Sequence, residues 1–162
     1  MELLEPTLAT MFIEQYKRLL SEVAGKPLGD TADFEKARVH LYENNLNKAC
    51  PINSEYAPSF VEAIRNAEYG MFIFAKKYRQ GYALKSRANV WYFATALSTP
   101  LEEFIHDWTI INTAVLPFHG QYVCDGLVVH RQVSIGKNMI HEMIQELKVE
   151  RAKHSPNKRI NY

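Results

Sequence analysis

The segment at residues 115–129, VLPFHGQYVCDGLVV, contains the residue types of a nucleophilic catalytic site. Cys124 could attack a substrate and His130 could serve as its general base, provided that the two side chains come within about 3 Å. Six strand residues separate two side chains by about 20 Å, and adjacent side chains point to opposite faces. Cys124, Asp125 and His130 therefore cannot form a local triad, and we expect Cys124 to be a small buried thiol.

Two turn-forming dipeptides in this segment compete for the tip of a β-hairpin: His-Gly at 119–120 and Asp-Gly at 125–126. Asp-Gly is a strong hairpin signal, but a turn there would leave only residues 121–124 for the strand before it. A turn at 119–120 gives two long arms, 108–118 and 121–130, and is the arrangement that we favour. The Asp-Gly pair then lies within a strand, where glycine marks a bulge or a close approach of the backbone.

Asp125 is the polar residue that most needs an explanation. With the turn at 119–120, it pairs with Ala114 on the preceding strand, and Asn112 lies diagonally on the same face. A carboxylate in an apolar strand must find hydrogen-bond donors or remain protonated. The interpretation that we favour is structural: Asp125 caps backbone amides at the bulge, with Asn112 as a further partner. The other is functional: Asp125, Asn112 and His119 contact a ligand in a pocket under the sheet.

Three helices that would position this hairpin are predicted in the first 70 residues. The first spans about 6–25, since apolar residues recur every three or four positions at Leu8, Phe12, Tyr16, Leu19 and Val23. The second begins near Asp30, a good N-cap, ends before Pro51, and has an inward face formed by Val39, Tyr42, Leu46 and Ala49. The third is shorter, follows Pro58 and stops by residue 70.

The rest of the chain is rich in β-forming residues and closes with a helix. The predicted strands are 71–78, 82–86, 90–97, 108–116 and 122–130. Their short connections predict antiparallel neighbours, and 101–107 forms one helical turn. The last helix spans about 134–152, with a buried stripe of Ile135, Met139, Ile140, Met143, Ile144 and Leu147.

The order of these elements predicts an α+β fold. N-terminal helices precede a curled antiparallel sheet of about five strands, and a C-terminal helix follows it. We expect one domain at residues 1–154 and a polar tail at 155–162 that frays.

The composition is that of a soluble globular protein. The hydrophobic fraction is 47%, and the aromatic fraction of 12% argues against disorder. A formal charge of +1 provides no global field toward nucleic acid or membrane. The N-terminus lacks the basic start of a secretory signal, and no apolar run is long enough to span a bilayer. Cys50 and Cys124 could form one disulfide, but the interpretation that we favour is two reduced thiols in a cytoplasmic protein.

No metal or cofactor site is predicted. His141-Glu142 begins a zinc-protease motif, but Gln145 replaces the second histidine. Glu142, Glu146 and Glu150 are interpreted as a solvated helix face, and Ser134 as a helix cap rather than part of an anion site.

A cluster of basic and aromatic residues surrounds the first predicted hairpin. Such a surface could stack bases and contact phosphates, although basic hairpins also protect sheet edges. The candidate nucleic-acid-binding residues are Lys76, Lys77, Tyr78, Arg79, Tyr82, Lys85 and Arg87.

The runs AVLPFHGQYVCDGLVV and GMFIFAKKYRQGYAL together resemble a pattern in uncharacterised bacterial proteins. In these, a Leu-Leu-Pro-Phe-like strand, a glycine turn and a Tyr-Asp-Gly-Leu-like strand follow an aromatic strand near a basic pair. The resemblance spans about residues 60–129, and Cys124 stands where an aromatic residue is expected. It implies no known activity. It does imply that Pro117, Phe118, Asp125 and Gly126 belong to a defining hairpin.

We therefore expect a non-catalytic domain that binds a protein or a small molecule, with homo-oligomers possible in principle. Nucleic-acid binding through residues 76–87 is the alternative, and a small enzyme that uses Asp125 in a pocket is the third hypothesis. No membrane partner is expected.

Overall fold

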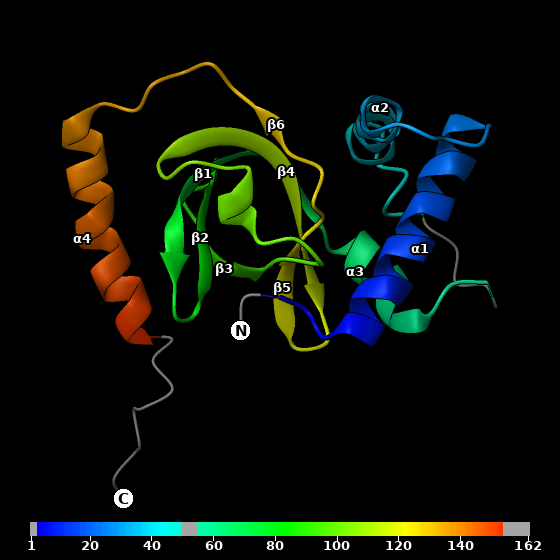
Figure 1. Ribbon diagram of the computed structural model, residues 1–162, viewed down its shortest axis with the longest axis horizontal. Coiled ribbons are helices and arrows are strands. Elements are labelled where there is room, and N and C mark those ends of the chain that lie inside the picture. Colours follow the sequence, from blue (N-terminus) through cyan, green and yellow to red (C-terminus); the bar gives the residue numbers. More distant parts are fainter. Residues whose placement is uncertain (1–2, 50–54, 154–162) are drawn as a thin grey trace, which may run out of the picture.

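A computed structural model describes residues 3–49 and 55–153. The molecule has three parts along its longest axis: helices α1–α3 at one end, a closed sheet in the middle, and helix α4 at the other end (Figure 1). The predicted α+β class, with N-terminal helices and a C-terminal helix, is confirmed. The predicted tail at 155–162 and Cys50 lie outside the described residues.

Helix α1 (Pro6–Ala24) forms where its sequence pattern predicts it. The Glu5 carboxylate accepts hydrogen bonds from the amides of Thr7 and Leu8, and Gly25 ends the helix in the left-handed conformation, with φ 71°. Side chains of the predicted stripe are buried, among them Phe12, Tyr16 and Leu19. The helix therefore presents one apolar face to the sheet.

Helix α2 (Thr31–Glu43) is shorter than predicted, and the face that it buries shares only Tyr42 with the predicted face. Asn45, with φ 55°, takes the chain out of the helix. Leu46, predicted to face inward, is 45% exposed. The residues that α2 buries are Ala37, Arg38, Leu41 and Tyr42. Helix α3 (Pro58–Arg65) then leads into the sheet.

The sheet contains six strands in the order β1-β2-β3-β5-β4-β6, and an additional β1–β4 pairing closes it into a small barrel. The strands are β1 (Glu68–Tyr78), β2 (Gly81–Ser86), β3 (Trp91–Thr95), β4 (Thr109–Phe118), β5 (Gln121–Cys124) and β6 (Val129–His130). The expectation that all neighbours are antiparallel is wrong for one pair, because β3 and β5 are parallel. The chain between β3 and β4, which includes the 3-10 helix η1 (Leu101–Glu103), carries β4 away from β3 to pair with β1, and β5 fills the gap.

One glycine allows two neighbouring strands to approach closely. A Cβ atom on Gly81 would lie 2.9 Å from the carbonyl oxygen of Ala94, and its φ of 132° also disfavours any other residue. Gly81 therefore permits β2 to start directly against β3 at the end of the β1–β2 turn.

The interior of the closed sheet is filled with side chains, and helices cover two parts of its outer surface. Phe72, Phe74, Tyr82 and Leu84 lie in the interior cluster. Helices α1–α3 pack on the outer faces of β4 and β5 through Leu116, Phe118 and Val123, among other residues.

Helix α4 (Lys137–Lys153) packs on the opposite side, against β1, β2 and β3. Only Met143 and Leu147 of its predicted stripe are buried, and Met139 is 53% exposed. Ile135, Ile140 and Ile144 are half-buried, so the predicted stripe is wrong at Met139 rather than throughout. Among the described helices, none combines the length and apolar character needed to cross a membrane.

Candidate functional site

The predicted hairpin of residues 108–130 has its turn at His119 and Gly120. Phe118 pairs with Gln121, and both turn residues have positive φ, 50° and 75°, as a type I′ turn requires. The second arm is not one strand, however. It divides into β5 and β6, and residues 125–128 between them lie outside regular pairing.

This irregular segment is the predicted bulge. Cys124 pairs with Val115 and Val129 pairs with Asn112, so four residues, 125–128, lie opposite only two residues of β4. Gly126 takes a φ of 80° that glycine adopts easily. The amide of Asp125 still donates to the Ala114 carbonyl oxygen at 3.0 Å, as the register predicts.

The carboxylate of Asp125 is buried and accepts hydrogen bonds from four residues. Tyr16 Oη donates to Oδ2 at 2.8 Å, and Arg38 Nη1 lies 3.1 Å from both oxygens. Thr113 Oγ1 and the Leu127 amide donate to Oδ1 at 3.1 and 3.0 Å. We call Asp125 and the four residues that donate to it the Asp125 cluster.

Arg38 provides the positive charge of the Asp125 cluster. Burial alone would lower the pKa of Arg38, but the Asp125 carboxylate, together with Tyr16 and Tyr69, raises this pKa above its ordinary value. The guanidinium carbon lies 5.1 Å from the centre of the Tyr69 ring, and Nη1 also donates to the Leu127 carbonyl oxygen. The side chains of the pair are 1% and 0% exposed. The ion pair thus joins α2 to the bulge without contact with solvent.

Hydrogen bonds extend the cluster to Tyr42 and Cys124. Because the single proton of the Tyr16 hydroxyl is donated to Asp125, Tyr42 must donate to Tyr16, at 2.9 Å. Burial and the nearby Asp125 carboxylate raise the pKa of Tyr16 well above its usual value. The Tyr16 hydroxyl therefore stays protonated at neutral pH and remains a hydrogen-bond donor.

Cys124 is the buried thiol that the sequence predicts. It is a free cysteine, fully buried, with Sγ 3.2 Å from Thr113 Oγ1. Burial raises the pKa of the Cys124 thiol to about 11, and the Asp125 carboxylate adds to this effect. A thiol that stays protonated at neutral pH is a poor nucleophile.

The three candidate ligand-binding residues do not converge. Asp125 is bound by its own donors, whereas His119 lies at the exposed hairpin tip. Asn112 was wrongly predicted to reach Asp125. The two extra residues of the bulge shift Asn112 opposite Val129, and its Oδ1 accepts from Arg131 Nε at 3.2 Å.

Thr113 takes the place that was predicted for Asn112, and sequence reasoning missed two other partners, Tyr16 and Arg38. The sequence did indicate that Asp125 needs hydrogen-bond donors from elsewhere in the chain, since a carboxylate in an apolar strand must be paired. Nothing in the linear sequence selects Arg38 from the other basic residues of the helices.

Asp125 also lies at the wall of an open pocket of about 390 Å³, between α1, the loop that precedes β4, and the bulge. Ile13, Leu97 and Phe104 are among the apolar residues that line it. No histidine lines this pocket in the described part of the chain. The pocket therefore lacks the His–Asp pair that the enzyme hypothesis would use.

Two of the five basic residues of the hairpin form ion pairs within the molecule. Lys77 Nζ lies 3.1 Å from Glu102, and Lys85 Nζ lies 2.6 Å from Glu146. The prediction that Tyr82 faces nucleic acid is wrong. Tyr82 is fully buried in the sheet interior, and its hydroxyl donates to Glu102.

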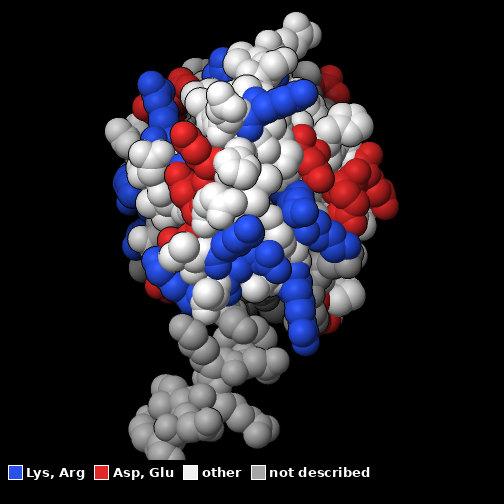
Figure 2. All heavy atoms as spheres, turned by 90° about the vertical axis from the view of Figure 1, so that its left-hand side faces the viewer, with Lys and Arg blue, Asp and Glu red and all other residues white. Residues whose placement is uncertain are grey.

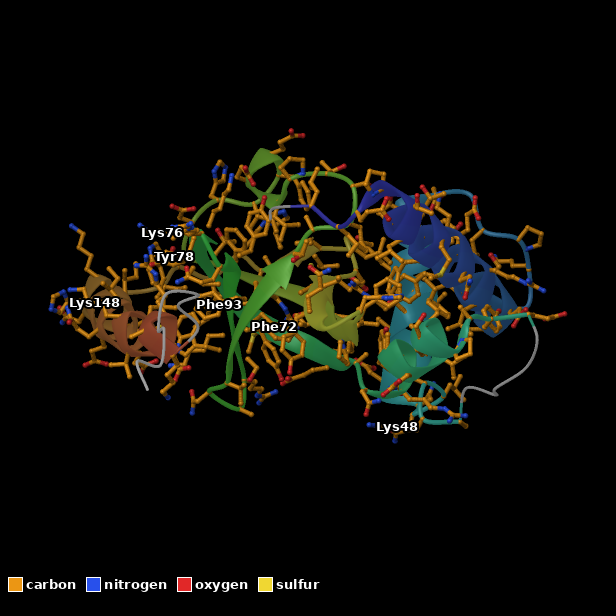
Figure 3. The ribbon with its side chains drawn as sticks, turned by 90° about the horizontal axis from the view of Figure 1, so that it is seen from below. Lys48, Phe72, Lys76, Tyr78, Phe93 and Lys148 are labelled. Atoms are coloured by element: carbon orange, nitrogen blue, oxygen red, sulfur yellow. The ribbon has the colours of Figure 1, made fainter. Side chains whose placement is uncertain are left out.

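Tyr78 is the other aromatic residue of the basic hairpin, and cations from two elements surround it. Arg151 on α4 lies 4.1 Å from the centre of its ring, and Lys76 lies 5.2 Å from it. Figure 3 shows Lys76 and Tyr78 beside α4, at the end of the molecule that also carries Lys148. On the face around α4, acidic side chains lie among the basic ones, which gather toward its lower end (Figure 2). The ring faces of Tyr78 and Tyr82 are therefore not free to stack bases.

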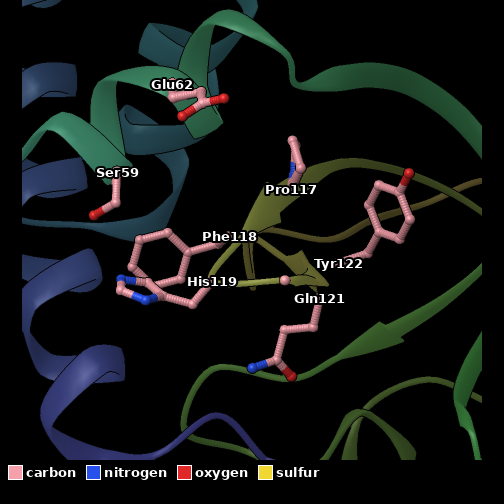
Figure 4. Close-up of a pocket in the computed structure, with 8 residues that line it drawn as sticks. Ser59, Glu62, Pro117, Phe118, His119, Gln121 and Tyr122 are labelled. Atoms are coloured by element: carbon pink, nitrogen blue, oxygen red, sulfur yellow. The ribbon is translucent and has the colours of Figure 1, made fainter.

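A second open pocket, of about 310 Å³, lies where the hairpin tip meets α3. We call it the hairpin-tip pocket; it is lined by Ser59, Glu62, Pro117, Phe118, His119, Gly120, Gln121 and Tyr122. Figure 4 shows Glu62 above the hairpin, Phe118 and His119 on one side of Pro117, and Tyr122 on the other. The side chains of Ser59, Glu62 and His119 form no hydrogen bond or ion pair with the described residues. Their polar atoms are thus available to a ligand.

Comparison with protein-family models, with curated proteins and with solved structures gives no match for this chain. No group of three or more His, Cys, Asp or Glu residues within 3–49 and 55–153 could hold a metal ion.

Proposed function

We propose that this chain is a non-catalytic binding domain whose ligand occupies the hairpin-tip pocket. The observation that carries the proposal is the set of polar side chains around that pocket. Ser59, Glu62 and His119 come from α3 and from the hairpin turn and border one open volume of about 310 Å³. Their side chains form no hydrogen bond or ion pair with the described residues. Small-ligand sites combine such a cavity with a few convergent polar groups.

The two residues with the greatest catalytic promise support a structural rather than a catalytic role. Asp125 accepts five hydrogen bonds, counting both contacts of Arg38, and a carboxylate so occupied cannot accept a substrate proton without breaking them. Cys124 is fully buried and its pKa is raised. We therefore place binding ahead of catalysis, and ahead of nucleic-acid binding through residues 76–87, where Tyr82 is buried.

The cellular setting and the bacterial resemblance remain part of the proposal. The free thiol of Cys124 is what a reducing, cytoplasmic setting would preserve. The hairpin that carries the resemblance forms one wall of the proposed site.

Amide chemical shifts of the isotope-labelled protein, recorded against a library of small polar compounds and short peptides, test the proposal. Ligands should shift the amides of residues 59–62 and 118–122 first. His119→Asn removes the imidazole while asparagine tolerates the positive φ, and should weaken binding; His130→Asn, an exposed control on β6, should not. Shifts confined to other parts of the chain would overturn the proposal.

A further inference from the structure

The charge of the hairpin-tip pocket has one sign. Glu62 is its only formally charged residue, and no lysine or arginine stands among the described residues that line it. The Glu62 side chain is exposed and forms no ion pair with the described residues. A ligand that enters the pocket therefore meets a carboxylate that forms no ion pair with a cation of residues 3–49 or 55–153.

Aromatic rings form the walls on both sides of this carboxylate. Tyr122 is 43% exposed, and its ring packs edge to face with that of Tyr92, with ring centres 4.9 Å apart. On the other side, the His119 and Phe118 rings meet edge to face at 4.5 Å. Both pairs hold a ring in a fixed position at the pocket. Ring faces attract organic cations, because their π electrons present negative charge.

The uncharged polar groups of the pocket fit the same ligand. The Ser59 hydroxyl can accept a hydrogen bond, and so can one nitrogen of a neutral His119 ring. Gln121 is partly committed, since its Oε1 accepts from Thr95 Oγ1 at 3.0 Å. An ammonium or guanidinium group, which only donates, would therefore find acceptors on α3 and on the hairpin turn.

We propose that the hairpin-tip pocket binds an organic cation: an ammonium or guanidinium group on a short aliphatic chain. This proposal rests on the proposed function and names its ligand class. A volume of about 310 Å³ lies at the lower end of small-ligand sites and suits one such group. A free amine and a lysine or arginine side chain of a peptide share this chemistry.

Titrations followed by amide chemical shifts test the charge requirement with matched probes. n-Butylammonium, ethylguanidinium and the peptide acetyl-Gly-Lys-Gly-amide carry the cation. n-Butanol and butyrate have the same chain without it. The cations should bind at residues 59–62 and 117–122 at least tenfold more tightly than butanol or butyrate. Added salt should raise the Kd of the cations, because it screens the Glu62 charge.

Paired variants then identify the groups responsible. Glu62→Gln keeps the shape of the side chain and removes its charge, and should raise the Kd of n-butylammonium about tenfold. Glu103→Gln removes an exposed charge on η1 and should leave this Kd unchanged. Tyr122→Ala should also raise the Kd. Unchanged amide shifts outside the pocket would show that each variant is folded.

The outcomes separate the two proposals. If butanol or butyrate binds in the pocket as tightly as the cations, the ligand class is wrong and the binding site stands. If no probe and no library compound shifts the pocket amides, both proposals fail. Tighter binding of the lysine peptide than of n-butylammonium would support a peptide as the source of the cation, and the reverse order would support a free amine.

Discussion

Helices cover the closed sheet on two sides, and the two covers are held in different ways. Helix α1 buries five residues against the sheet and its neighbours, and α2 adds the fully buried Arg38–Asp125 ion pair. Helix α4 buries only Met143 and Leu147, and the Glu146 side chain of its ion pair with Lys85 is 46% exposed. The N-terminal helices are therefore part of the core, whereas α4 is an attached cover.

The difference shows where in this fold the loss of a charged side chain should change the free energy of unfolding. A buried ion pair costs free energy to form, but loss of one partner leaves the other charge buried and unpaired. An exposed ion pair contributes little, because water and salt screen it. The two covers should respond very differently to the same kind of substitution.

The largest effect is expected at the Asp125 cluster. Asp125→Ala should lower the free energy of unfolding by about 3–5 kcal/mol, because Arg38 keeps its charge without a partner. Tyr16 and Thr113 would lose their acceptor as well. Urea unfolding followed by tryptophan fluorescence measures the change.

The double variant Arg38→Met/Asp125→Leu is the control for that prediction. It removes both charges at similar volume and should recover part of the lost stability. A loss below about 1 kcal/mol for Asp125→Ala would show that the ion pair does not anchor α2, and the contrast between the covers would lose its main support.

A matched pair of leucines compares the apolar contacts of the two covers. Leu20 on α1 and Leu147 on α4 are each 1% exposed. Substitution of a buried leucine by alanine costs about 2–5 kcal/mol, and least where neighbours can close the cavity. Leu20→Ala should therefore cost more than Leu147→Ala, as measured by urea unfolding. Equal losses would mean that α4 is as tightly packed as α1.

Alkaline pH should lower the free energy of unfolding because of the buried thiol of Cys124. The folded-state pKa, raised to about 11 by burial, lies above the value of an unfolded thiol, near 8.5. Stability is thus independent of this group below about pH 8 and falls as the pH rises toward 11, by a few kcal/mol in all.

The same property protects the thiol from alkylation. In a Cys50→Ser background, iodoacetamide should modify Cys124 at pH 8 only when urea unfolds the protein. A Cys124→Ala variant should lose part of the alkaline destabilisation. Rapid modification of the folded protein would contradict the buried placement of the thiol.

The smallest effect is expected at the ion pair of α4. Glu146→Gln should lower the free energy of unfolding by less than about 1 kcal/mol, because Glu146 is partly exposed. Its hydrogen bond from Trp91 Nε1, 3.1 Å long, can persist with the glutamine oxygen. Double-mutant cycles with Lys85→Met would measure the pair itself. A coupling as large as that of Arg38 and Asp125 would remove the distinction between the covers.

Local patterns predicted the parts of the fold that local physics decides. The spacing of Phe12, Tyr16 and Leu19 predicted α1 because the helix packs one face on the core. The His119-Gly120 turn was chosen correctly because it leaves two arms long enough to pair. The bulge at Asp125 followed from the same choice.

Partners distant in the sequence were not predictable in this way. Arg38 and Asp125 are 87 residues apart, and Arg38 lies beside, rather than on, the apolar face that was assigned to α2. The parallel β3–β5 pair arises because β4 pairs with β1, a choice made by the whole sheet. Likewise, the hairpin-tip pocket requires α3 to lie against the turn, and Ser59 and Glu62 carry no signal of that contact in the sequence.

The β1–β4 pairing that closes the sheet has a consequence for how fast the chain folds. It joins residues as distant as Glu68 and Val115, so the chain between them must be gathered before the pairing can form. Proteins dominated by such distant contacts fold in milliseconds to seconds, far more slowly than helical bundles. Helix α4 docks on β1, β2 and β3, so these strands must be in place before it can attach.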